Sequence, residues 1–258
     1  MSDAGAREAA GAASAGLVSE AAAREAAYGV FSQLVGGRLS DETLEAARLH
    51  DGLAPHLQDP RESAAALVSG LTHGAYPHAG VFLDDPPLLG GDAADARARR
   101  WAGWGLSEAP FVSEPEHLAT HLAALSFLCG AEADAAQDRA PTEVARMRDQ
   151  QRALLDDLLL PWLPAWAVAV GPGGLCGALA GALAALVAEH RGALGPASTS
   201  VVAPPSPRAE PATEPPVPLD LAAAETSLRD VVAWLTTPAR CGLLLTRAHL
   251  SEAGRALD

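Results

Sequence analysis

The chain has 258 residues, a length that allows one large domain or one domain with an appendage. It carries 18 Arg, no Lys and 32 Asp or Glu, which gives a formal net charge of −14. Binding to nucleic acid or to an anionic membrane surface needs clustered cationic side chains, so neither is expected of this chain. Such acidity would suit a basic ligand, and it would equally serve only to keep an alanine-rich chain soluble. Hydrophobic residues make up 49% and aromatic residues 4%, and the abundant alanine favours closely packed helices.

Cysteine usage and the N-terminal sequence bear on the compartment. Cys129, Cys176 and Cys241 are widely spaced and form no Cys-x-x-Cys pair, which argues against a disulfide framework or a zinc knuckle. The N-terminus lacks a basic stretch followed by an apolar stretch, so no secretory signal is predicted. We therefore expect a cytoplasmic protein.

The first part of the chain predicts three helices. Helix-forming residues run from about 6 to 34 and end at Gly36-Gly37. Ser40, followed by two acidic residues, predicts the N-cap of a short helix. Asp59 and Pro60 predict the next helix start, with Asp59 as the cap and Pro60 in the first turn.

The next stretch alternates loop and helix. Pro, Gly and Asp residues between Tyr76 and Gly91 predict an ordered loop, after which Asp92 can cap a helix. Ser113 is expected to cap the helix after that, and Glu116 three residues on would complete a capping box.

Two long helices with regular apolar spacing are predicted beyond this point. One contains Leu118, Leu122 and Leu125 on one face, and the other opens at Pro141. An uncharged run from 158 to 188 is long enough to span a membrane, at roughly 20 residues needed. Its Pro and Gly residues break it into pieces, so a buried helical hairpin is the better interpretation.

The C-terminal part begins with a segment rich in Pro, Ala, Ser and Thr. It has too few large apolar residues to offset its ordering entropy, which predicts a mobile linker. An amphipathic helix over 221–235 and a short final helix near Thr246 follow. The sequence thus predicts an all-α fold, with a helical-bundle-like domain at 1–192, a linker at 193–218 and a helical segment at 219–258.

Two motifs at helix ends carry a family resemblance. The first is Glu114-Pro115-Glu116-His117-Leu118 at a helix start, and the second runs from Gln151 through Leu155 to Pro161-Trp162 at the end of the next helix. Together they resemble the TorD/DmsD/NarJ family of all-helical cytoplasmic chaperones, which escort molybdenum-containing oxidoreductases. Glu116 stands where the family usually has Asp. The resemblance covers roughly residues 20–190.

The resemblance implies a binding protein with no cofactor of its own. Its partner would be the apo-form of a molybdopterin oxidoreductase subunit, or that subunit's N-terminal, twin-arginine type signal peptide. The chaperone would hold the subunit for cofactor insertion and assembly before export. Transient contact with the export or cofactor-insertion machinery fits that role, whereas nucleic acid and membrane insertion do not.

The family's acid–His pair contributes to a peptide groove, which implies such a role for Glu116 and His117. A short connection favours antiparallel neighbours, so the end of the second helix should lie beside the start of the first. The predicted peptide-binding residues are Pro115, Glu116, His117, Pro161, Trp162, Trp166, Trp104 and Phe111. Ordinary roles compete with this prediction, because Glu116 could complete a capping box and the aromatic residues could fill the core.

Catalysis has little support in the sequence. Glu114, His117 and His121 lie one helical turn apart and could hold a metal, which leaves open a small metal-dependent hydrolase. No further ligand is evident, and neither a phosphate loop nor a nucleophile elbow occurs. We therefore expect no catalytic residues and no enzyme. A helical scaffold for a different partner is the other alternative.

Overall fold

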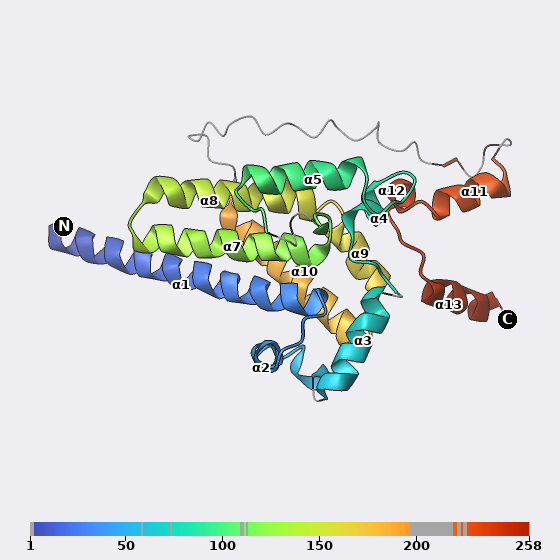
Figure 1. Ribbon diagram of the computed structural model, residues 1–258, viewed down its shortest axis with the longest axis horizontal. Helices are drawn as coiled ribbons and strands as arrows, with labels where there is room; N and C mark the ends of the chain where they lie inside the picture. Colours follow the sequence, from blue (N-terminus) through green and yellow to red (C-terminus); the bar gives the residue numbers. More distant parts are fainter. Residues whose placement is uncertain are drawn as a thin grey trace.

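The computed structural model describes residues 3–57, 59–72, 74–108, 111, 113–196, 219–220, 223 and 226–257, and the side chains of these residues from 15 onward except at 72, 92, 93, 248 and 257. Helices supply all the regular elements of this part of the chain, which confirms the all-α prediction (Figure 1). They are α1 (Asp3–Val35), α2 (Asp41–Arg48), α3 (Pro60–Thr72), α4 (Ala79–Leu83), α5 (Asp92–Gly103), α7 (Leu118–Gln137), α8 (Pro141–Leu154), α9 (Leu163–Val170), α10 (Gly174–Leu194), α11 (Leu228–Leu235), α12 (Pro238–Cys241) and α13 (Arg247–Leu257).

Long helices form the body of the molecule. Figure 1 shows α1, α7 and α8 lying side by side, with α10 behind them. The loop between α7 and α8 is short, and the two helices run antiparallel, as the sequence predicted. Leu118, Leu122 and Leu125 of α7 are fully buried, so the predicted apolar face is the face that packs into the core.

A buried polar network joins the long helices. The Tyr28 hydroxyl is 2.9 Å from Nδ1 of His190, and Nε2 of His190 is 2.9 Å from Oε1 of Gln151. Nε2 of Gln151 donates to Oε2 of Glu132 at 2.9 Å, and Arg148 lies 3.6 Å from Oε1 of the same carboxylate. Because an amide oxygen only accepts, Nε2 of His190 is the protonated nitrogen and its Nδ1 accepts from Tyr28. The network therefore connects α1, α7, α8 and α10 and fixes their positions relative to one another.

Local capping signals were predicted correctly at two helix starts. Oγ of Ser40 accepts from the Thr43 amide at 3.1 Å at the start of α2. Oδ1 of Asp59 accepts from the amides of Arg61 and Glu62 at the start of α3. Both caps join neighbouring residues, which is why the sequence reveals them.

The stretch between residues 76 and 91 differs from the predicted loop, because it contains the short helix α4. The predicted cap of α5 was also wrong. Gly91, with φ of 81° and ψ of −164°, is the N-cap, and Asp92 is already the first helical residue. That backbone conformation favours glycine, so the helix start is set by Gly91 rather than by a side-chain cap.

The chain after α10 is described in part. The linker was predicted at 193–218, and its residues 197–218 lie outside the described part of the chain. α10 ends at Leu194, just past the domain boundary expected at 192. α11 begins at Leu228 behind a capping box formed by Ser227 and Asp230, whereas residue 221, the predicted start, is not described. The final helix is confirmed as α13, and α12, which was not expected, packs against α4.

The apolar run from residue 158 is interrupted as predicted. A turn of π-helix, η2 (Leu155–Leu159), ends α8, and a bend separates it from α9. In the described residues no single helix is long and apolar enough to span a membrane, while Pro141–Leu159 and Leu163–Val170, bent by 55°, reach that length and composition only as a pair.

Candidate functional site

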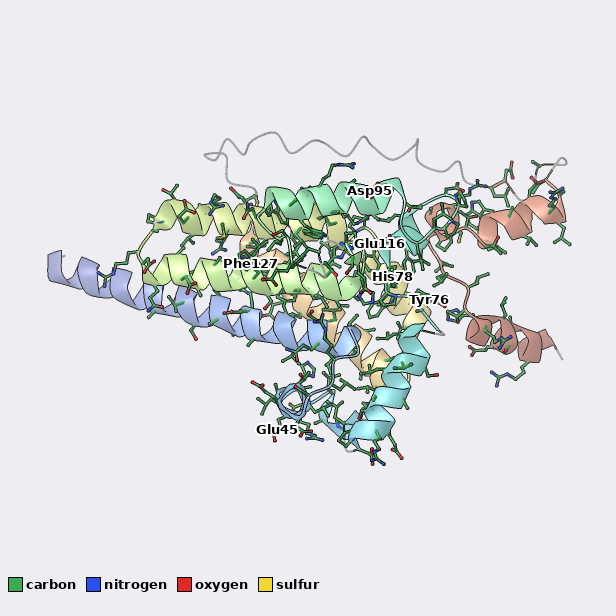
Figure 2. All side chains as sticks on the ribbon, viewed as in Figure 1. Glu45, Tyr76, His78, Asp95, Glu116 and Phe127 are labelled. Atoms are coloured by element: carbon green, nitrogen blue, oxygen red, sulfur yellow. The ribbon has the colours of Figure 1, made fainter. Side chains whose placement is uncertain are left out.

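The first motif precedes α7 and is tied to the segment before α4. His78 and His117 face each other in an isolated antiparallel bridge. The Ala79 amide donates to the Glu116 carbonyl at 3.1 Å, and the Leu118 amide donates to the Pro77 carbonyl at 2.7 Å. Figure 2 shows His78 and Glu116 close together beside the start of α7.

This bridge determines where α7 begins, and the predicted capping role of Ser113 was wrong. Since the backbone around His117 is extended and paired, the helix cannot start before Leu118. His117 is the N-cap, and its Nδ1 accepts from the Ala119 amide at 3.0 Å. Glu116 therefore precedes the helix and cannot be the capping-box residue that the sequence suggested.

The Glu116 carboxylate joins distant parts of the backbone instead. The residue is only 3% exposed, and its Oε1 accepts from the Gly90 amide at 2.7 Å while its Oε2 accepts from the Gly80 amide at 3.0 Å. A Cβ at position 80 would lie 2.5 Å from Oε2, so glycine permits this close approach. Buried Arg97 is near enough to feel the charge: burial lowers the pKa of Arg97, and Glu116 and Asp84 oppose that shift.

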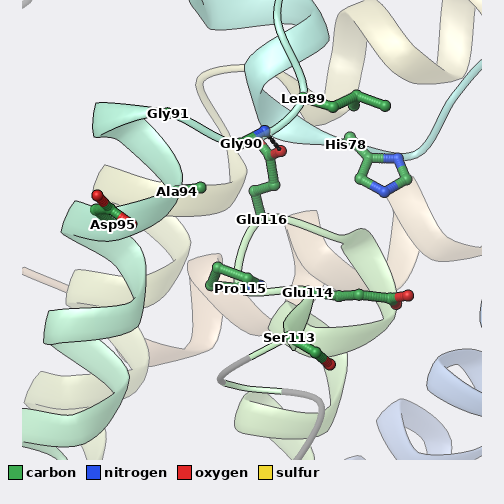
Figure 3. Close-up of a pocket in the computed structure, with 10 residues that line it drawn as sticks. All are labelled: His78, Leu89, Gly90, Gly91, Ala94, Asp95, Ser113, Glu114, Pro115 and Glu116. Carbon is green, nitrogen blue, oxygen red and sulfur yellow. Dashed lines mark hydrogen bonds between the residues drawn. The ribbon is translucent and has the colours of Figure 1, made fainter.

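A pocket with a volume of about 400 Å³ opens at this junction (Figure 3). Its wall comes from the loop before α5, from the first turn of α5 and from the segment before α7. The lining residues are His78, Leu89, Gly90, Gly91, Ala94, Asp95, Ser113, Glu114, Pro115 and Glu116. Asp95 and Glu114 are exposed, so their carboxylates can meet a ligand, whereas the Glu116 carboxylate holds the wall together.

The two bridge histidines are neutral at pH 7. Burial lowers the pKa of His78, although Glu116 and Glu114 act in the opposite direction. Burial, assisted by His78 and Arg38, lowers the pKa of His117 to about 4. Their rings meet edge to face with centroids 4.6 Å apart, and His78 lines the pocket with His117 against it.

The tryptophans of the second motif lie in the core. Trp162 and Trp166 are both 0% exposed. Nε1 of Trp162 donates to the Leu158 carbonyl at 2.8 Å, and its ring stacks on Phe82 at 5.7 Å. Nε1 of Trp166 donates to Ala75 O at 3.1 Å. The prediction that these indoles line a surface groove is therefore wrong, and core packing is the role that the geometry supports.

The predicted meeting of the two helix ends nevertheless occurs. His121, in the first turns of α7, contacts Trp162 with ring centroids 5.9 Å apart and Trp101 with centroids 5.3 Å apart. His121 is fully buried, and burial lowers its pKa to about 3. Antiparallel packing thus brings the first turns of α7 beside the end of the second motif, and the contact between them is internal.

The remaining predicted residues lie outside the pocket lining. Phe111 is buried against Trp101, while Trp104 is half-buried and has the Arg100 guanidinium 5.4 Å from its ring centre. Pro161 is exposed at the turn before α9. Of the eight residues, Pro115 and Glu116 line the pocket, and His117 contacts the lining residue His78.

Sequence reasoning missed the part of the pocket formed by the loop before α5 and by the first turn of α5. Leu89, Gly90, Gly91 and Asp95 line it together with His78. The available signal was a Gly-Gly pair followed by acidic residues, a pattern that any loop before a helix can show.

The predicted metal alternative has no geometric support. In the described part of the chain no group of three or more His, Cys, Asp or Glu side chains is placed to hold a metal ion. Nδ1 of His117 accepts from an amide, and Nδ1 of His121 is 3.0 Å from the His117 carbonyl, so both nitrogens serve the start of α7.

Comparison with protein families bears directly on this region. Residues 43–168 match the family of the nitrate reductase delta subunit. That family consists of molybdoenzyme maturation chaperones. The matched range begins in α2, ends in α9 and includes every residue that lines the pocket. No curated protein and no solved structure matches the chain.

Proposed function

We propose that this protein is a maturation chaperone for a molybdopterin oxidoreductase and that it acts in the cytoplasm without catalysing a reaction. The observation that carries the proposal is the family match over residues 43–168, because all of the pocket lies within it. An all-helical fold with an open, acidic pocket suits the capture of a peptide rather than a chemical step.

The proposed ligand is the N-terminal signal region of the enzyme's catalytic subunit, of the twin-arginine type. Asp95 and Glu114 present exposed carboxylates at the pocket, and carboxylates bind guanidinium groups through paired, charge-assisted hydrogen bonds. Leu89, which is 59% exposed on the wall, offers an apolar contact for the hydrophobic part of such a segment. The net charge of −14 would speed the encounter with a basic peptide.

The roles of the motif residues follow from their positions. Glu114 would contact the peptide, Glu116 would hold the pocket wall, and His117 would support the ring of His78 from behind. The bound subunit would be kept until its cofactor is inserted, with transient contact to the insertion or export machinery. A helical scaffold for another basic partner is the second candidate, supported by the same acidic pocket.

A peptide titration tests the proposal. Twin-arginine peptide should bind the native chain, and a matched peptide with both arginines replaced by glutamine should bind at least about tenfold more weakly, since each close charged contact across an interface contributes on the order of 1 kcal/mol or more. Affinity should also fall between low and high salt, because exposed charges are screened over about 8 Å at physiological ionic strength. Equal affinity for the two peptides would contradict the proposed ligand.

A further inference from the structure

The C-terminal part of the chain returns to the element next to the pocket. α12 packs against α4, and Arg240 forms a two-pronged ion pair with Asp85, directly after α4. Nε of Arg240 is 2.6 Å from Oδ2 of Asp85, and its Nη2 is 3.1 Å from Oδ1. The planar guanidinium and the carboxylate thus form a bidentate pair, in which two parallel hydrogen bonds fix the orientation of both groups.

Burial shows where this C-terminal contact is concentrated. Pro238 and Thr246 are buried, and Leu244 packs against the hydrophobic core. The flanking helices contrast with it, since Leu228 on α11 is 79% exposed and Leu250 on α13 is 60% exposed. Residues 238–246 are therefore the anchored part, and we call them the strap.

The strap holds the segment that builds the pocket wall. From Asp85 the chain continues to Leu89, Gly90 and Gly91, which line the pocket. On the other side of Asp85, α4 carries Gly80, the second amide bound by Glu116. The loop between the two amides is thus fixed at Glu116 from inside and at Arg240 from outside.

We propose that the strap is a positioning element for the pocket. It holds the 84–91 loop so that Leu89, Gly90 and Gly91 form an ordered pocket wall before a ligand binds. A wall ordered in advance lowers the entropy that binding must overcome, which raises affinity without a new contact to the ligand. The strap lies outside residues 43–168, so this device is additional to the part of the chain that matches the chaperone family.

The loop claim is tested in the ligand-free, full-length protein by amide hydrogen exchange. Arg240→Asp places like charges face to face, so the amides of residues 84, 85 and 88–91 should exchange about threefold to fivefold faster, the range expected for losing a well-oriented surface pair. Arg255→Asp is the matched control, because it makes the same charge change on α13, where the bond found for Arg255 within the described part of the chain is to the Ser251 carbonyl of its own helix. The swap Asp85→Arg with Arg240→Asp should restore slow exchange. Unchanged exchange in Arg240→Asp would overturn the proposal.

The pocket claim rests on the proposed function and has its own readout. Arg240→Asp should bind twin-arginine peptide about threefold or more weakly than both the control and the swap, because the wall is no longer ordered in advance. Faster exchange with unchanged affinity would overturn the positioning role. A native chain that binds no peptide would refute the proposed ligand instead, and the exchange result would still decide whether the strap holds the loop.

Discussion

Glu116→Gln tests the structural role of the Glu116 carboxylate in the first motif. The glutamine has nearly the same shape, but its amide nitrogen cannot accept a hydrogen bond. Either the Gly80 or the Gly90 amide must therefore lose its acceptor, and buried Arg97 loses a nearby negative charge.

The expected cost follows from these contacts. A hydrogen bond to a charged group contributes about 1.5–3 kcal/mol, and a buried amide left without an acceptor adds a further penalty. Loss of the negative charge near the buried Arg97 guanidinium also lowers the stability of the folded protein. We expect Glu116→Gln to lower the free energy of unfolding by about 2–4 kcal/mol.

Urea denaturation followed by circular dichroism measures this difference. Glu114→Gln is the matched control, since Glu114 lines the same pocket with an exposed side chain and its loss should change stability by no more than about 0.5 kcal/mol. A Glu116→Gln variant as stable as the control, with an unchanged denaturant slope, would refute the role assigned to this carboxylate.

Three further predictions concern the core. Trp162→Ala should lower the free energy of unfolding by about 3–5 kcal/mol, because the fully buried indole leaves a cavity; a stable variant that only loses peptide binding would contradict its place in the core. Tyr28→Phe should lower it by about 1–2 kcal/mol by leaving Nδ1 of His190 unpaired, and an unchanged urea midpoint would exclude that bond. Burial lowers the pKa values of His121 and His190 from 6.5 to about 3, so the unfolded chain takes up protons first as the pH falls. Each histidine should therefore lower the free energy of unfolding by about 2 kcal/mol between pH 7 and pH 5, as measured by urea denaturation at a series of pH values. A free energy of unfolding that does not change over this range would argue that the two rings are not buried in the neutral form.

The sequence predicted those features whose partners lie close along the chain. Ser40 and Asp59 cap helices through amides two or three residues away, so the residue types alone reveal them. Helix periodicity located the buried face of α7 for the same reason. The antiparallel placement of α7 and α8 also followed, because it depends only on a short connection.

The features that sequence reasoning missed depend on distant backbone. The partners of Glu116 are amides 36 and 26 residues away, and an amide carries no side-chain signal to mark it as a partner. A nearby capping pattern therefore gave a false assignment. The burial of Trp162 and Trp166 was equally hidden, since an aromatic residue at a helix end can face solvent or the core. Contacts with Phe82 of α4 and with Ala75 before it decide which.

A double-mutant cycle between chain and peptide tests the central claim most directly. The affinities of native protein and Glu114→Gln are measured for the twin-arginine peptide and for peptides in which one arginine is replaced by glutamine. If the pocket holds that arginine, one combination should show a coupling of about 1 kcal/mol or more, as close charge pairs across interfaces do. Coupling near zero for both arginines, with Glu114→Gln fully folded, would contradict the assignment of this pocket as the peptide site.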